Sequence, residues 1–126
     1  NKALVIDDNK KNIAVMEALL EDEGFQVYSL INPNQIDSEQ LAEENISVVF
    51  LDLEMPTADG YEVLQHLRTI SGLDVTPIIA CTVHLGEMKH TQDNGFDGFL
   101  GKPLDADRFP GQLSRILRGE SVWESQ

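Results

Sequence analysis

Residues 47–56 read SVVFLDLEMP, and four apolar residues in this stretch, Val48 to Leu51, run directly into the carboxylate of Asp52. An uninterrupted apolar run of this length is typical of a strand that is buried on both faces of a parallel sheet. A carboxylate at the tip of a buried strand is costly unless another group compensates its charge. We therefore expect the chain to place partners for Asp52 beside the end of this strand.

Strands and helices alternate on both sides of this stretch. The apolar spacing predicts one helix closed by Gly24, one that ends near Gly72, one that ends before Gly119, and a weaker acidic helix up to about Glu44. Such alternation implies right-handed crossovers and a parallel sheet with helices on both faces. The predicted strands lie at residues 2–7, 25–30, 46–52, 76–82 and 96–100.

Length and charge limit the classes of function. A chain of 126 residues suits one domain, which we expect at 1–119, with 120–126 as a short C-terminal tail. The formal net charge of −13 argues against binding to nucleic acid or to an anionic membrane surface. No apolar run approaches the ~20 residues of a membrane-spanning helix. A single cysteine, Cys81, cannot form an internal disulfide, which favours a cytoplasmic location and a buried thiol.

Polar side chains follow several of the predicted strands. The first strand ends with Asp7 and Asp8, the third with Asp52 and the fourth with Thr82, and the fifth leads into Lys102. Ligands of open parallel sheets bind outside the carboxyl ends of the strands. We therefore expect three carboxylates, one hydroxyl and one ammonium to meet at one edge of the sheet.

This set of groups predicts phosphoryl chemistry. Two carboxylates ~4 Å apart repel each other by about 4 kcal/mol at an effective dielectric constant of ~20, so the cluster either protonates or holds a cation. An all-oxygen set of few protein ligands suits Mg²⁺. An ammonium and a hydroxyl beside the metal could hold the oxygens of a transferring phosphoryl group. Asp52, on the central strand, is then the best-placed nucleophile.

In this arrangement the chain resembles the receiver domains of response regulators, the phosphoaspartate switches of two-component signalling. The resemblance extends from about Lys2 to Leu117, and it implies a flavodoxin-like (βα)5 fold with five parallel strands in the order 2-1-3-4-5. The motifs that carry it are VIDDNKKN at 5–12, VVFLDLEMPTADGYEVL at 48–64, IIACT at 78–82 and FDGFLGKPL at 96–104.

The resemblance assigns the phosphoacceptor and the metal ligands. It implies that Asp52 is phosphorylated, that Asp8 binds Mg²⁺ directly and Asp7 largely through water, and that the backbone carbonyl of Glu54 completes the protein ligands. Such a domain is not a conventional enzyme, because it catalyses only the phosphorylation and dephosphorylation of its own aspartate.

The resemblance also assigns the residues that respond to the phosphoryl group. Thr82 would donate a hydrogen bond to it, Lys102 would pair with it, and Phe99 would be the switch aromatic. Pro103 would follow a cis peptide bond. The implied partners are a histidine kinase or a histidine phosphotransfer protein, an unidentified downstream protein, and a second copy of the chain through the fourth helix, fifth strand and fifth helix.

Three features depart from the family pattern. Val83 stands where receivers have alanine or glycine, and its bulk is expected to narrow the path to Asp52. Thr82 and Lys102 are 20 positions apart, about two fewer than is common, so we expect a short or distorted fourth helix. Glu54 and His84 occupy the two variable positions beside the phosphoryl pocket, where they are expected to influence the lifetime of the phosphoaspartate.

Other functions remain open from the sequence. A pseudo-receiver would keep the fold as a protein-binding module without phosphorylation, and Val83 leaves room for it. A Mg²⁺-dependent phosphatase would need a second acid two positions after its nucleophile, where Glu54 stands. A flavin-binding protein of the same strand order is disfavoured, because the loop DDNKKN at 7–12 is acidic and would repel a phosphate.

Overall fold

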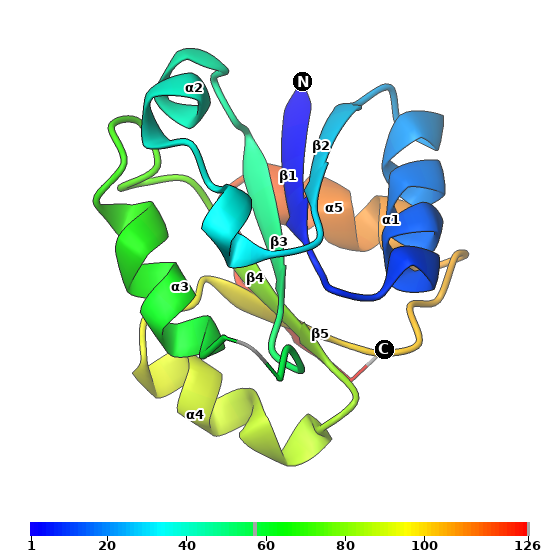
Figure 1. The fold of residues 1–126 in the computed structure, drawn as a ribbon. Coiled ribbons are helices and arrows are strands. Elements are labelled where there is room, and N and C mark those ends of the chain that lie inside the picture. Colours follow the sequence, from blue (N-terminus) through cyan, green and yellow to red (C-terminus); the bar gives the residue numbers. More distant parts are fainter. Residues whose placement is uncertain (57, 126) are drawn as a thin grey trace.

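The computed structural model describes residues 1–56 and 58–125, and in this part of the chain six parallel strands form one sheet in the order β2-β1-β3-β4-β5-β6 (Figure 1). The predicted order 2-1-3-4-5 of a flavodoxin-like sheet is confirmed, and β6 is an addition that the sequence did not predict. The strands are β1 (Lys2–Ile6), β2 (Gln26–Leu30), β3 (Val48–Asp52), β4 (Ile78–Thr82), β5 (Gly98–Gly101) and β6 (Val122–Glu124).

Helices cover both faces of this sheet, as predicted. Figure 1 shows α1 and α5 on one side and α2, α3 and α4 on the other. The helices are α1 (Lys10–Asp22), α2 (Ser38–Glu43), α3 (Gly60–Arg68), α4 (Met88–Asp93) and α5 (Phe109–Leu117), with single 3₁₀ turns at Pro33–Gln35 and Leu85–Glu87. None of these helices is long and apolar enough to cross a membrane.

The central strand β3 contributes to the core on both faces, which explains its uninterrupted apolar run. All five of its residues are buried. Val48 and Phe50 join the cluster under α1 and α5, whereas Val49 and Leu51 join the cluster under α2, α3 and α4. Successive side chains of a strand point to opposite faces, so a run of apolar residues fills both cores at once.

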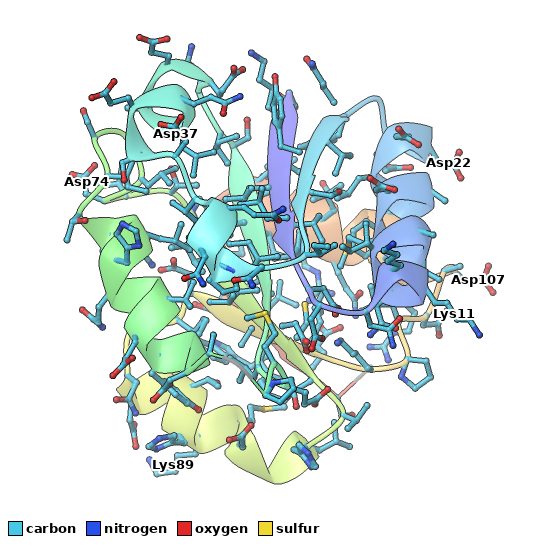
Figure 2. All side chains as sticks on the ribbon, in the orientation of Figure 1. Lys11, Asp22, Asp37, Asp74, Lys89 and Asp107 are labelled. Atoms are coloured by element: carbon cyan, nitrogen blue, oxygen red, sulfur yellow. The ribbon has the colours of Figure 1, made fainter. Side chains whose placement is uncertain are left out.

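Polar residues lie on the outside of this framework and at the helix ends. Acidic side chains such as Asp22, Asp37, Asp74 and Asp107 project from the periphery (Figure 2). Asn9 caps α1, because its side chain accepts hydrogen bonds from two backbone N–H groups of the first turn. The cap of α1 is therefore Asn9 and neither Asp7 nor Asp8, although Asp7 Oδ1 accepts the backbone N–H of Asn9 at 2.9 Å.

The helix α4 is short, as the spacing between Thr82 and Lys102 predicted. It has six residues and follows directly on the 3₁₀ turn Leu85–Glu87. Its inner face is anchored by Thr91, which is fully buried, and by Met88, which packs against the core.

The strand β6 lies within the segment that we expected to be a tail. It pairs in parallel with β5 in the register Phe99 to Trp123. Trp123 packs against the core cluster under α3 and α4, and the Glu124 carboxylate accepts hydrogen bonds from Arg108 and Gln112 and forms an ion pair with Arg115. A strand of three residues has too little pattern to be recognised in a sequence, so only its contacts show it.

Candidate functional site

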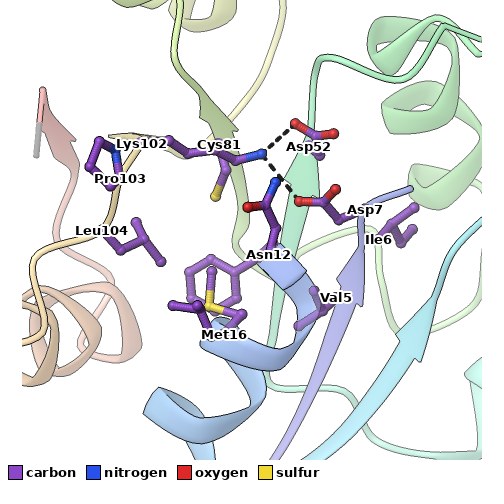
Figure 3. Close-up of a pocket in the computed structure, with 12 residues that line it drawn as sticks. Val5, Ile6, Asp7, Asn12, Met16, Asp52, Cys81, Lys102, Pro103 and Leu104 are labelled. Atoms are coloured by element: carbon purple, nitrogen blue, oxygen red, sulfur yellow. Dashed lines mark hydrogen bonds and ion pairs between the residues drawn. The ribbon is translucent and has the colours of Figure 1, made fainter. Parts of the chain in front are cut away.

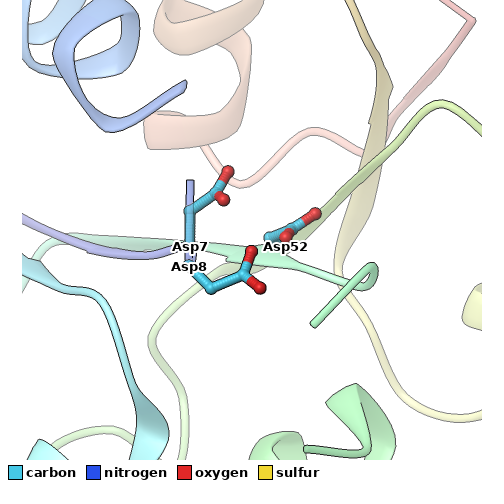
Figure 4. A group of neighbouring side chains, drawn as sticks. All are labelled: Asp7, Asp8 and Asp52. Carbon is cyan, nitrogen blue, oxygen red and sulfur yellow. The ribbon is translucent and has the colours of Figure 1, made fainter. Parts of the chain in front are cut away.

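Three carboxylates meet at the carboxyl ends of β1 and β3, as the strand ends predicted. Asp7 and Asp8 follow β1, and Asp52 is the last residue of β3 (Figure 4). Each offers one carboxylate oxygen, and these oxygens lie within 4.8 Å of one another. Asp7 and Asp52 are buried, whereas Asp8 is exposed to solvent.

Lys102 is the partner that the buried end of β3 requires. Its Nζ donates a hydrogen bond of 2.7 Å to Asp52 Oδ1 and one of 3.1 Å to Asp7 Oδ2 (Figure 3). Its backbone N–H donates to the carbonyl oxygen of Thr82 at 2.9 Å, which fixes the loop after β5 against the end of β4. The peptide bond between Lys102 and Pro103 is cis, as predicted.

The charges of this cluster do not balance. Three carboxylates and one ammonium leave a net charge of −2 within a few ångströms. Burial raises the pKa of Asp52, and its hydrogen bond with Lys102 only partly offsets that effect. Burial alone would lower the pKa of Lys102, but the hydrogen bonds and charges of Asp52 and Asp7 raise it above the ordinary value. The site therefore attracts further positive charge.

Replacement of Asp52 by asparagine is expected to stabilise the Mg²⁺-free protein at pH 7, by about 1 kcal/mol, the scale of a single substitution. The pKa of Asp52 in the folded state is raised above its ordinary value of 3.8. At pH values between 3.8 and this raised pKa, the folded state therefore binds more protons than the unfolded state. The charged Asp52 therefore lowers stability progressively as pH rises through the raised pKa.

Urea unfolding in EDTA at pH 4 to 7 measures this effect. The stability gain of Asp52→Asn over the native chain should be largest at pH 7 and should shrink as pH falls toward 4. The matched control is Asp74→Asn, which removes an exposed carboxylate and should show no such trend. A variant that is less stable than the native chain at pH 7 would contradict the prediction.

Thr82 lies at the same edge of the sheet, but its partner was not predicted. Its hydroxyl donates to the carboxylate of Glu54, and the backbone N–H of Val83 donates to Glu54 Oε1 at 2.6 Å. The resemblance placed the Glu54 side chain beside the phosphoryl pocket but predicted no contact between it and Thr82. The available signal was an acid two positions after Asp52, since alternation along an extended chain returns it to the side that Asp52 occupies.

The other predicted residues differ in their environment. Phe99 is fully buried, whereas Val83 and His84 are exposed beside the site. The backbone N–H of His84 donates to the hydroxyl oxygen of Thr82 at 3.0 Å. Cys81 is buried, and burial raises the pKa of its thiol to about 12, which excludes it as a nucleophile at neutral pH.

A cleft of about 260 Å³ opens beside the carboxylates, between α1 and the loop after β5 (Figure 3). Met16 and Phe50 form part of its apolar wall, Leu104 flanks it, and Asp52 and Lys102 line its polar end. The polar end of this cleft therefore adjoins the group of carboxylates.

The donor set fits Mg²⁺. It consists of oxygen atoms only, from carboxylates that converge from two strand ends, and one of its members, Asp8, is exposed. A hard cation that keeps several waters needs few protein ligands and an open side. The cluster of Asp7, Asp8 and Asp52 can therefore bind a metal ion of this kind.

Known proteins of one family resemble this chain over nearly its whole length. The response regulator receiver domain matches residues 3–114. The transcriptional regulatory protein CpxR of Escherichia coli K12 is 30% identical over 128 residues, which cover 100% of this chain and 53% of CpxR. The histidine-protein kinase BarA of the same strain is 26% identical over 121 residues, covering 94% of this chain and 13% of BarA. The chain thus spans about half of CpxR.

Solved structures of similar fold include a receiver domain and a chemotaxis protein. The receiver domain of the sensor histidine kinase PA1611 from Pseudomonas aeruginosa PAO1 has a TM-score of 0.74 and 26% identity, with 93% of each chain covered, and a magnesium ion is coordinated in its active site cleft. The chemotaxis protein CheY4 of Vibrio cholerae has a TM-score of 0.80 at 23% identity, with 91% of this chain and 97% of CheY4 covered. At that identity the likeness to CheY4 shows the fold alone.

Proposed function

Because this chain belongs to the response regulator receiver domains, a family of signalling switches and not conventional enzymes, we propose that it accepts a phosphoryl group on Asp52 in a Mg²⁺-dependent reaction and thereby changes its binding to another protein. One observation carries the proposal. The Lys102 ammonium lies between the carboxylates of Asp52 and Asp7, at the polar end of a cleft that is open to a donor.

In the proposed reaction a carboxylate oxygen of Asp52 attacks the phosphorus of a phosphohistidine. A P–O bond forms, the P–N bond breaks, and its electron pair remains on the imidazole of the donor. Lys102 and Thr82 would hold the equatorial oxygens through an ammonium and a hydroxyl. Asp7, Asp8, Asp52 and the backbone carbonyl of Glu54 would hold Mg²⁺, which would supply positive charge to the phosphoryl oxygens.

The partners follow from this reaction. The donor would be a histidine kinase or a histidine phosphotransfer protein, since receivers of two-component systems receive their phosphate from phosphohistidine. CpxR is named as a transcriptional regulatory protein and BarA as a histidine-protein kinase, so a domain of this kind occurs as a part of both kinds of protein. We place the domain in the cytoplasm, where histidine kinases act, and this is consistent with the free thiol of Cys81.

Phosphorylation would draw Thr82 inward and reshape the surface formed by α4, β5 and α5, which would be the output surface. Phe99 is already buried in the structure and would stay buried. The strand β6 occupies the edge of β5 in the structure. A homodimer through this surface would therefore have to include or displace β6. We propose that 1–119 form the receiver proper and that the last residues dock on it as this additional strand.

The test is the intact mass of the protein after incubation with acetyl phosphate or phosphoramidate. A gain of one phosphoryl group is expected with Mg²⁺, and no gain is expected in EDTA or in Asp52→Asn. The same measurement is repeated with a phosphohistidine-containing protein as the phosphoryl donor. Absence of phosphorylation with every donor would instead identify a pseudo-receiver, the alternative that the occupied hydroxyl of Thr82 favours.

A further inference from the structure

The side chain of Glu54 lies beside Thr82 and Lys102, the two residues that the proposed function assigns to the phosphoryl oxygens, and it also contacts the backbone of Val83. Its Oε1 accepts hydrogen bonds from the Thr82 hydroxyl and from the Val83 backbone N–H. Its Oε2 lies 3.9 Å from the Lys102 Nζ. A hydroxyl, an amide and an ammonium thus surround one carboxylate at the end of β4, beside Asp52.

The backbone explains how Glu54 reaches this position. The N–H of Leu53 donates to the carbonyl oxygen of Cys81 at 3.1 Å, so the pairing of β3 with β4 continues one residue beyond Asp52. The N–H of Glu54 then donates to Asp52 Oδ1 at 3.2 Å, which holds the turn against the phosphoacceptor. Side chains alternate along an extended chain, so the side chain of Glu54 returns toward the end of β4.

Thr82 and Val83 cannot donate to Glu54 and to a phosphoryl oxygen at the same time, because each has a single proton to donate. A threonine hydroxyl has one proton to donate, and a backbone amide has one. One of the two lone pairs of Thr82 Oγ1 is also used, since the hydroxyl oxygen accepts the N–H of His84 at 3.0 Å. Thr82 has no solvent exposure, so water cannot provide a substitute partner. The hydroxyl proton of Thr82 and the amide proton of Val83 are therefore both already donated to Glu54.

We propose that Glu54 is an internal competitor of the phosphoryl group: its carboxylate holds Thr82 and Val83 in the unphosphorylated chain and must be displaced when Asp52 is phosphorylated. This inference rests on the proposed function and concerns the regulation of the same site. Both occupants are anions with several oxygen acceptors, and hydrogen bonds to an ionised acceptor are about twice as strong as neutral ones. Displacement of Glu54 therefore opposes phosphorylation.

Two substitutions separate the reach of Glu54 from its charge. Glu54→Asp keeps the carboxylate but shortens the side chain by one methylene, so it cannot reach Thr82 and Val83 in the same way. Glu54→Gln keeps the length and removes the charge. If occupancy opposes phosphorylation, Glu54→Asp and Glu54→Ala should both gain a phosphoryl group from phosphoramidate roughly tenfold faster than the native chain, because each lost bond to a charged acceptor is of that scale.

The control is Glu62→Ala, which removes an exposed acid from α3 and should leave the rate unchanged. A second readout needs no phosphorylation. In NMR spectra of the unphosphorylated protein the amide proton of Val83, which donates to Glu54 at 2.6 Å, should lie far downfield and should move upfield in Glu54→Asp and Glu54→Ala. The same shift should be absent in Glu62→Ala.

The outcomes are distinct. Faster phosphorylation of Glu54→Asp together with the upfield shift of Val83 supports the inference. If the native chain is phosphorylated as fast as Glu54→Asp and Glu54→Ala, the inference is wrong and the proposed function still stands. Faster phosphorylation of Glu54→Gln and Glu54→Ala with an unchanged rate in Glu54→Asp also overturns the inference. The charge of Glu54, and not its contact with Thr82 and Val83, would then oppose phosphorylation. Absence of phosphorylation in every variant overturns both.

Discussion

Replacement of Lys102 by methionine is expected to slow phosphorylation of Asp52 by 100- to 1000-fold in saturating Mg²⁺, the usual loss when one preorganised group that stabilises transition-state charge is removed. Lys102 is well placed for this role, since its Nζ lies 2.7 Å from Asp52 Oδ1. Its side chain is only 12% exposed, so the ammonium acts where water screens it little. Methionine has a similar length and no charge, and thus isolates the electrostatic contribution.

The rate of mass gain with phosphoramidate measures this effect, and thermal unfolding shows whether each variant is folded. The matched control is Lys89→Met, which removes an exposed ammonium from α4. Lys102→Arg keeps the charge with a different shape and should retain part of the rate. A folded Lys102→Met that is phosphorylated within about threefold of the native rate would show that Lys102 only compensates the charge of Asp52.

The architecture could be read from the sequence because each strand of the sheet except β6 has a strong local signal. The four residues of β3 before Asp52 are all apolar and buried, and Gly24 and Gly72 adopt the positive φ values that end elements sharply. Asp52 could also be assigned a partner, since a buried carboxylate requires one. The identity of that partner as Lys102, 50 residues away, followed only from the rule that strand ends meet at one edge.

The contacts of Glu54 and the strand β6 could not be read in the same way. Whether Glu54 returns toward β4 depends on whether the β3 ladder continues through Leu53, and one hydrogen bond to Cys81 decides that. The strand β6 depends on a partner far from it in sequence, and the residues 122–124 show no pattern of their own. Both features depend on contacts between residues that are far apart in the sequence, and local strand propensity is too weak to predict them.

Gly101→Ala is expected to detach β6 and to lower the free energy of unfolding by about 1–3 kcal/mol, the usual cost of added volume in a packed region. A Cβ at Gly101 would overlap the backbone carbonyl oxygen of Ser125, and one at Gly98 would lie 2.8 Å from that of Val122. Backbone atoms of a paired strand cannot yield as a flexible side chain can. The glycines at both ends of β5 therefore leave the space that β6 fills.

Trp123 reports directly on this strand, because it is the single tryptophan of the chain and lies in β6. Its fluorescence should shift to longer wavelength in Gly101→Ala as the indole leaves the core. Gly111→Ala is the control, since a Cβ there meets nothing within 4 Å and a helix gains slightly from alanine. An unchanged emission spectrum and an unchanged urea midpoint in Gly101→Ala would show that β6 shifts along β5 without leaving it. A red shift would instead mean that the edge of β5 opens by displacement of β6, and that a partner of the α4, β5 and α5 surface must compete with this strand.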